Sequence, residues 1–317
     1  MSDEKNLLSA GLHIVNRHKR YVIWFWILNL AIAWFGAIAF RQAIASTLDH
    51  SLLADRLLHG FDVPVFIEIM MRPETGSTEV PAKAATHFAF VFLFATLIFL
   101  PGVFEGYINE GRLSRENFFR ACGRNLWRFI RVFLTFAIVA GTIAQLLFLG
   151  EEKLVKVAGD STNELLPFIT EVSALALIFL IVTALRIWFD LAQVDIVARD
   201  QRAIRKSLAA GFRYTRRYLL SLLGSYVLIA LVAAAVLIAG VWVWHVAVPP
   251  ASVGGAFVVS QIVLILWLWA RFWQRGTAAA FYLREMAVPP PAFVPVQPVA
   301  SAVPLPPPLG PEGLAPS

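Results

Sequence analysis

The sequence predicts an all-α protein, a bundle of six transmembrane helices with two basic interfacial amphipathic helices. Of its 317 residues, 58% are hydrophobic and only 15% are charged, whereas soluble domains have about 45–50% apolar and about 25% charged residues. The apolar residues are gathered into runs long enough to cross the roughly 30 Å hydrocarbon core of a bilayer as helices. Composition and run length together exclude an ordinary soluble protein.

Six apolar runs supply the predicted spans. They are residues 21–40, 88–104, 129–149, 168–189, 218–246 and 252–270. The first follows a basic start and ends near Ala43-Ile44-Ala45, a small-residue pattern like that of a signal-peptide cleavage site. Its apolar run is longer than the ~7–15 residues usual in a signal peptide, so we expect an uncleaved membrane helix.

The basic residues lie mainly in alternate connections, which predicts the orientation of the spans. Four precede the first span, six lie in the second connection, eight in the fourth and three after the sixth. The fifth connection has no basic residue, and the basic residues of the first and third connections lie among acidic residues. Because positive charge in short loops marks the cytoplasmic side, we expect both termini to be cytoplasmic, with residues 1–20 as a cytoplasmic N-terminal segment.

Two basic segments have the pattern of amphipathic helices that lie in the headgroup plane of a membrane. The first follows the second span and repeats arginine at helical spacing along one side, at Arg120, Arg124, Arg128 and Arg131. The second follows the fourth span, and its basic side consists of Arg202, Lys206, Arg213, Arg216 and Arg217. Anionic lipid attracts such residues by about 1 kcal/mol each, so anionic headgroups are an expected partner. The alternative is that these loops collect arginine through the positive-inside rule alone.

Ionisable residues near the inner ends of the spans form the candidate ligand site. Charged groups at membrane depth are unfavourable and are functional candidates by default. The second, fourth and sixth spans end on the same side where the third begins, so their charged residues should share one depth. The members of this predicted belt are Glu105, Arg128, Arg131, Arg186, Asp190 and Arg271. The belt could hold a lipid headgroup or small anion; alternatively, Arg186 and Asp190 pair on one helix face and the others reach water.

The search for catalytic chemistry is nearly empty. The sequence carries none of the common catalytic or nucleotide-binding signatures, and Cys122 is its only cysteine, so no disulfide forms within the chain. The outer connection holds Asp49, His50, Asp55, His59 and Asp62, but their spacing matches no metal-ligand signature. We therefore expect no enzyme activity, metal or cofactor. We also expect no nucleic-acid partner, because the chain lacks a soluble surface to read one.

Proline and glycine mark two further features. Pro101 and Gly102 are predicted to kink the second span, and Gly102 with Gly106 forms a Gly-x-x-x-Gly pattern that permits close helix contact. Residues 289–317 contain 11 prolines and almost no charge. They are expected to form an extended, disordered cytoplasmic tail, which leaves residues 21–288 as the transmembrane domain.

The passage Asp190-Leu-Ala-Gln-Val-Asp195-Ile-Val-Ala-Arg-Asp200, then Ala203-Ile-Arg-Lys-Ser-Leu208, resembles a pattern found in bacterial multi-pass membrane proteins of unassigned function. It is also distantly similar to the membrane domain attached to some glycerophosphodiester phosphodiesterases. Members of that family that are enzymes carry a separate soluble catalytic domain, and no segment here is long or polar enough to be one. The resemblance therefore implies a membrane module and not phosphodiesterase activity. We expect the protein to lie in a bacterial inner membrane.

These features predict a non-catalytic integral membrane protein that organises lipid or a membrane protein partner at the cytoplasmic face. The alternative is a carrier of a small or lipid-like molecule. A carrier requires an accessible cavity among the helices, whereas a packed, dry bundle would count against it.

Overall fold

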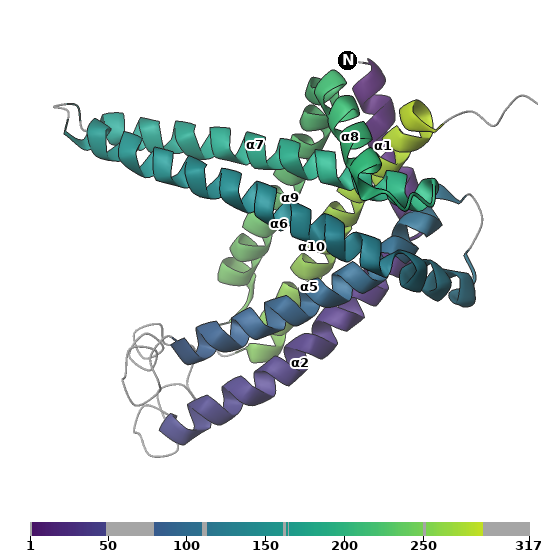
Figure 1. Cartoon of the computed structure of the whole chain (residues 1–317). Helices are drawn as coiled ribbons and strands as arrows, with labels where there is room; N and C mark the ends of the chain where they lie inside the picture. The colour runs from purple at the N-terminus through teal and green to yellow at the C-terminus, as the bar shows by residue number, and fades with distance from the viewer. Residues whose placement is uncertain are drawn as a thin grey trace, which may run out of the picture.

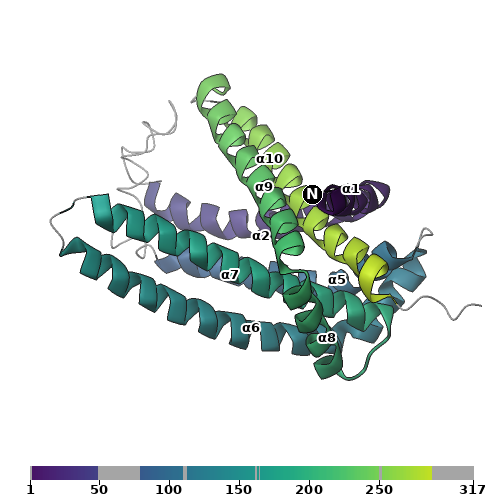
Figure 2. The ribbon, with the colours of Figure 1, turned by 90° about the horizontal axis from the view of Figure 1, so that it is seen from above.

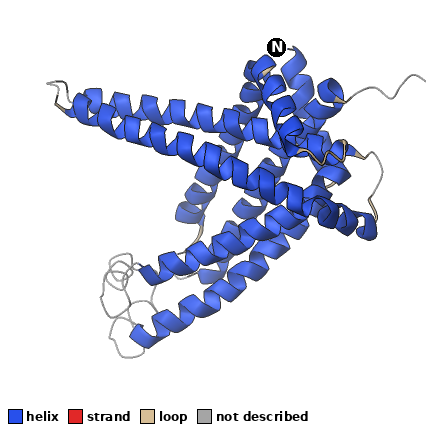
Figure 3. Cartoon of the chain, viewed as in Figure 1, coloured by secondary structure: helices blue, strands red, loops and turns tan. Residues whose placement is uncertain are grey.

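The computed structural model describes residues 2–48, 79–109, 113–160, 163, 165–249 and 252–287, and every regular element in them is helical (Figures 1 and 3). The α-helices are α1 (Ser2–Arg17), α2 (Arg20–Leu48), α5 (Glu79–Ile108), α6 (Arg115–Gly159), α7 (Leu165–Ala198), α8 (Ile204–Arg217), α9 (Leu219–Ala247) and α10 (Val253–Phe281). A π-helical turn, η2 (Tyr282–Met286), follows α10. The predicted all-α fold is confirmed.

Six of these helices are long and apolar enough to cross a membrane: α2, α5, α6, α7, α9 and α10. Each contains one of the six predicted apolar runs, apart from Tyr218 and Ser252, which lie just before α9 and α10, so the predicted number and order of candidate spans are confirmed. The helices extend beyond the runs at their polar ends. The 45 residues of α6, at 1.5 Å per residue, give a helix roughly 68 Å long, more than twice the thickness of the hydrocarbon core.

The two basic segments fold differently from one another. The first was predicted to be a separate helix but forms the first turns of α6. No proline interrupts the chain between Arg115 and Gly159, so the helix continues. The second is a separate 14-residue helix, α8, and the chain turns at Tyr218 before α9 begins. The Tyr218 ring packs at this turn against Phe281 of α10, with ring centroids 5.3 Å apart.

The spans form three antiparallel hairpins, α2/α5, α6/α7 and α9/α10, which diverge from a common end (Figures 1 and 2). We call this common end the hub; it consists of residues 7–25, 97–109, 113–132, 187–229 and 268–286. The largest fully buried side chains all lie there: Val15, Tyr21, Phe104, Phe129, Ile187, Leu191, Ile196, Leu222, Tyr226, Ile229 and Phe272. The hub is therefore the packed core of the protein, and it is also where the basic ends of the helices meet.

Outside the hub, the hairpins expose large apolar side chains. Ile138 of α6 is 69% exposed, and Ile238 of α9 is 71% exposed. In water such surfaces would be unfavourable by about 25 cal/mol per Å² of apolar area. In a bilayer they would face hydrocarbon, which supports assignment of the chain as a membrane protein.

Glycines allow the closest helix contacts in the hub. A Cβ atom at Gly102 of α5 would lie 2.6 Å from the ring of Phe118 in α6, and one at Gly106 would collide with Tyr21 of α2. The predicted Gly-x-x-x-Gly contact is therefore confirmed, although its two glycines face different helices.

The N-terminal segment, predicted only as a cytoplasmic region, forms α1 and packs along α10. Gly11 lies against Thr277, and Gly276 lies against the carbonyl of Gly11, where a Cβ atom would be 2.7 Å from the oxygen. The Trp273 indole donates to the Leu8 carbonyl at 3.0 Å. These contacts make α1 part of the hub.

Candidate functional site

The predicted belt of charged residues divides into two clusters and one isolated residue. Glu105 and Arg128 belong to a network of ion pairs that joins α5, α6 and the end of α7. Arg186, Asp190 and Arg271 line a cavity between the helices. Arg131 is exposed, and its guanidinium lies 5.9 Å from the centre of the Trp127 ring. The structure therefore does not assemble one continuous belt.

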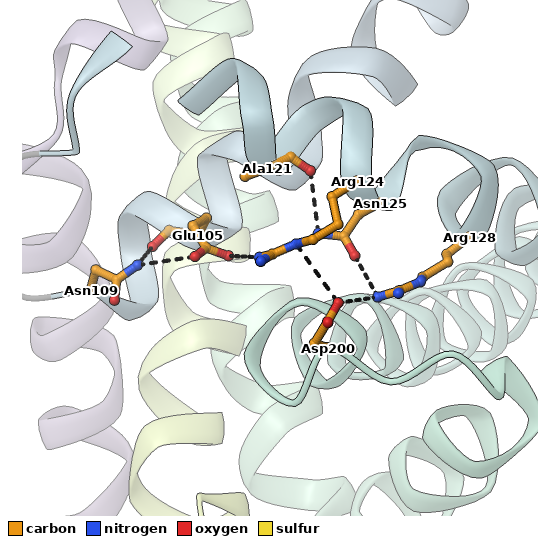
Figure 4. Close-up of polar contacts among 7 residues, drawn as sticks. All are labelled: Glu105, Asn109, Ala121, Arg124, Asn125, Arg128 and Asp200. Carbon is orange, nitrogen blue, oxygen red and sulfur yellow. Dashed lines mark hydrogen bonds and ion pairs between the residues drawn. The ribbon is translucent and has the colours of Figure 1, made fainter. Parts of the chain in front are cut away.

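The first cluster, which we call the latch, consists of Glu105, Arg124, Asn125, Arg128 and Asp200 (Figure 4). The Arg128 guanidinium donates to Asp200 at 2.5 Å and to the Asn125 amide oxygen at 2.9 Å. Arg124 donates to Glu105 at 3.3 Å, and its Nε lies 3.7 Å from Asp200. Two cations thus face two carboxylates, so the latch is balanced in charge.

Asp200 occupies a special backbone position at the end of α7. Its φ is +48°, in the left-handed region, which aspartate tolerates better than most residues. The following residue, Gln201, donates its N–H back to the Ile196 carbonyl at 3.1 Å, so the turn also ends the helix. The hydrogen bond from Arg128 lowers the pKa of the Asp200 carboxyl. These contacts indicate that the latch fixes the chain between α7 and α8.

The second cluster, which we call the arginine site, consists of Arg186 and Asp190 on α7, Tyr226 on α9, and Arg271 and Arg275 on α10. Arg186 Nε lies 3.7 Å from Asp190 Oδ2, and the Tyr226 hydroxyl donates to the same oxygen at 3.0 Å. The Arg271 guanidinium stacks 4.5 Å from the centre of the Trp267 ring. The predicted Arg186–Asp190 pairing is confirmed, but Arg271 and Arg275 have no carboxylate partner there among the ion pairs of the described residues.

Two cavities meet at this cluster. The larger, of about 600 Å³, lies among α2, α5, α6, α7 and α10 and is lined mainly by phenylalanine and leucine side chains. The smaller, of about 220 Å³, lies among α7, α9 and α10. Arg186, Arg271 and Trp267 line both cavities. The arginine pair is thus accessible from two sides of the α7–α10 contact.

The smaller cavity continues into an apolar groove between α9 and α10. This groove has a volume of about 700 Å³ and shares Leu237 and Trp267 with the smaller cavity. Its lining is apolar apart from Ser260. The groove runs away from the hub along the hairpin, so a hydrocarbon path extends from the arginine site.

Several buried polar atoms around the arginine site have no hydrogen-bond partner. They are Arg275 Nε, Gln193 Oε1 and Gln274 Oε1. Each such atom is unfavourable by about 1–3 kcal/mol if it stays unpaired. The site therefore has polar atoms available for further hydrogen bonds. Gln193, Tyr226, Gln274 and Arg275 were missing from the predicted site. The spacing of Arg271, Gln274 and Arg275, three and four residues apart on one helix face, is the signal that could have found two of them.

The basic face of α8 is exposed as predicted, at Arg202 just before the helix and at Lys206, Arg213, Arg216 and Arg217 within it. Its opposite face packs on α7, where the Trp188 indole donates to the Leu208 carbonyl at 2.7 Å and Gly211 lies against Trp188. The first basic segment is only partly available. Arg120 is exposed beside Glu116, whereas Arg124 and Arg128 are engaged in the latch.

Comparisons of the chain with protein families, with curated proteins and with solved structures find no match. Among the residues that the structure describes, no three His, Cys, Asp or Glu side chains gather as metal ligands would. The acidic and histidine-containing stretch from Asp49 to Asp62 lies outside the described residues. The latch, the arginine site and the basic face of α8 are the polar features of the described residues that bear on function.

Proposed function

We propose that the chain is a non-catalytic integral membrane protein that binds an anionic lipid, with the headgroup at the arginine site. The observation that carries the proposal is the charge of that site. Three guanidinium groups and one carboxylate line the two cavities, within helices apolar enough to span a membrane. An anion there would neutralise charge that the protein itself leaves unbalanced.

Guanidinium chemistry favours a headgroup ligand. Arginine presents a planar set of N–H donors that pairs with phosphate or carboxylate through two parallel hydrogen bonds. An unpaired arginine at the centre of a membrane helix is unfavourable by about 2.5–3.5 kcal/mol on insertion scales, and less near the interface. A bound anionic headgroup offsets this penalty and supplies acceptors for donors such as the unpartnered Arg275 Nε.

The apolar surroundings favour an amphiphile over a free anion. The groove between α9 and α10 provides hydrocarbon contact that continues from the smaller cavity. Small-molecule sites of this kind combine a mostly apolar lining with a few placed polar groups. A lipid with its headgroup between Arg186 and Arg271 and one acyl chain in the groove would use both features.

The proposed orientation places the hub at the cytoplasmic side of a bacterial inner membrane, with both termini cytoplasmic. The basic ends of the helices and the exposed basic face of α8 converge at the hub, which agrees with the positive-inside rule. The basic face would attract anionic lipid to the same leaflet. The resemblance of the α7–α8 passage to bacterial membrane modules fits this placement.

The proposal is tested by native mass spectrometry of the full-length protein extracted in a mild detergent from its membrane. We expect wild type to retain an anionic lipid, and Arg271→Gln to retain about tenfold less, because each 1.4 kcal/mol of lost binding is tenfold in affinity. Lys153→Gln is the matched control, since it removes an exposed positive charge of α6 that lies outside the cavities. Equal retention by Arg271→Gln and wild type would refute lipid binding at this site.

The larger cavity supports a second candidate function, that of a carrier of a lipid-like molecule. Its position among five helices, on the other side of Arg186 and Arg271 from the groove, gives a ligand two routes to the same headgroup position. Reconstitution with a fluorescent anionic lipid in one leaflet distinguishes the two. Transfer to the other leaflet that is lost in Arg271→Gln supports a carrier, whereas binding without transfer supports a protein that organises lipid.

A further inference from the structure

The charges that line the two cavities do not cancel. Among the described residues lining them, the charged side chains are Arg186, Asp190, Arg271 and Arg275. Arginine stays protonated in proteins. Asp190 accepts a hydrogen bond from the Tyr226 hydroxyl and forms an ion pair with Arg186. Three guanidinium groups against one carboxylate leave the site with two positive charges in excess.

We infer that the ligand of the arginine site is a phosphate monoester carrying two negative charges, an inference that rests on the proposed function. A phosphate monoester carries about −1.5 to −2 charges at pH 7 and presents three strong acceptor oxygens. A phosphodiester headgroup carries one charge and two free oxygens. Of these two headgroup types, the monoester matches both the excess charge and the number of guanidinium groups.

The placement of the three arginines suits a single tetrahedral anion. Arg186 projects from α7, while Arg271 and Arg275 lie one turn apart on α10 and line the same cavity as Arg186. The buried Nε of Arg275 has no acceptor, and the Arg271 guanidinium carbon lies 4.5 Å from the centre of the Trp267 ring. A phosphate with three terminal oxygens can accept from all three side chains, whereas the single carboxylate of Asp190 reaches only Arg186.

Asp190 competes with the ligand for Arg186. Its 3.7 Å separation from Arg186 Nε is longer than a direct charge-assisted hydrogen bond of about 2.7–2.9 Å. Asp190→Asn raises the excess charge from two to three and keeps an oxygen that accepts from Tyr226. Arg275→Gln lowers the excess charge to one. The inference therefore predicts opposite effects for the two substitutions.

The experiment measures lipid binding by the full-length protein in nanodiscs of phosphatidylcholine that contain either phosphatidic acid or phosphatidylglycerol with the same acyl chains, at pH 8. We expect wild type to prefer phosphatidic acid by about tenfold, an amount equivalent to 1.4 kcal/mol. Arg275→Gln should lose the preference while still binding both lipids, Arg275→Lys should keep it, and Asp190→Asn should bind both lipids more tightly.

The outcomes separate the inference from the proposed function. Equal wild-type binding of the two lipids would overturn the monoester inference and leave anionic-lipid binding intact, whereas binding of neither would overturn both. This comparison needs no variant, so it decides the matter even if a substitution prevents folding. Displacement of phosphatidic acid by millimolar inorganic phosphate would support a free phosphate monoester as the source of the ligand. Resistance to displacement would support the lipid.

Discussion

Asp200 shows how one residue can join helix termination to tertiary contact. Its left-handed backbone ends α7 while its carboxylate holds Arg128, a buried side chain with Asn125 as its other partner. Substitutions can separate the backbone role of Asp200 from its ion pair with Arg128. Glycine would adopt the backbone conformation without strain but lose the ion pair, and asparagine would keep the backbone preference and lose the charge.

We predict that Asp200→Ala destabilises the protein more than Asp200→Asn or Asp200→Gly, because alanine loses the ion pair and also strains the backbone. The expected loss is about 1 kcal/mol for the ion pair, since Asp200 is half-exposed to solvent, and about 1 kcal/mol more for the backbone. Thermal unfolding in detergent measures the order. Glu116→Gln, in an exposed pair, should change little, and an Asp200→Ala protein as stable as wild type would contradict the role of the latch.

His18 should make the stability of the protein depend on pH. It is buried at the turn between α1 and α2, donates from Nδ1 to the Ile14 carbonyl at 3.0 Å and stacks on Tyr21. Burial, together with Arg17 and Arg20 nearby, lowers its pKa below the usual 6.5. The unfolded chain therefore binds a proton at a higher pH than the folded protein, and stability falls as the pH drops through 6.5 and below.

The measurement is the melting temperature of wild type and His18→Gln at pH 8 and pH 5. Wild type should lose more stability between these values than His18→Gln, while His13→Gln, at an exposed position, should behave as wild type. An identical pH dependence in wild type and His18→Gln would contradict a buried neutral imidazole.

At the residue scale, the sequence predicted contacts within one helix better than contacts between helices. The Arg186–Asp190 pair follows from a spacing of four residues on α7. The burial of Arg128 does not, because its partner Asp200 lies on another helix end and only the fold brings them together. Gln193 was overlooked because an uncharged polar residue gives no signal until a cavity appears beside it.

At the scale of elements, the docking of α1 on α10 depends on two glycines, Gly11 and Gly276. We predict that Gly11→Leu displaces α1 from α10, because even a Cβ atom at Gly11 would collide with Thr277. Trypsin cleavage near Arg17 and Lys19 should then be about tenfold faster, which corresponds to about 1.4 kcal/mol less protection against local opening.

Ala10→Leu is the matched control for this substitution, since Ala10 is the exposed neighbour on the same helix. It should be cleaved at the wild-type rate. Wild-type protection in Gly11→Leu would show that the glycine contact does not hold α1 in place.

The elements themselves followed largely from the sequence. Every apolar run became a helix because runs of this length and composition have no other satisfactory structure in a bilayer. The first basic segment was wrongly separated from the third span, since a change from charged to apolar side chains does not end a helix without a breaker. The docking of α1 could not be predicted, because Gly11 and Gly276 have no special spacing and their contact is set by tertiary packing.

At the scale of the whole molecule, the three hairpins share a packed hub and expose their apolar outer parts. The arginine site lies where the α6/α7 and α9/α10 hairpins meet, so it depends on the angle between them and not on any one helix. The apolar runs give the depth of a residue within one helix, and this depth identified Arg186 and Arg271 as candidates. The runs carry no information about packing between helices, so they did not reveal that the two arginines share two cavities.

The arrangement of hairpins predicts which sites face each side of the membrane. In a Cys122→Ala background, Asn163→Cys and Val248→Cys at the far ends of two hairpins should react with a membrane-impermeant maleimide in intact spheroplasts. Arg213→Cys on α8 should react only after the membrane is opened, because the hub is assigned to the cytoplasmic side. Labelling of Arg213→Cys from outside would reverse the proposed orientation.

The central claim is that an anionic headgroup lies between α7 and α10 at the arginine site. It is tested most directly by cryo-electron microscopy of the full-length protein in nanodiscs containing phosphatidic acid, with a bound antibody fragment to aid alignment. We predict headgroup density within hydrogen-bond distance of Arg186, Arg271 and Arg275, and acyl-chain density in the α9–α10 groove. A map in which these arginines pair with acidic side chains of the protein, with no lipid between the two helices, would contradict the claim.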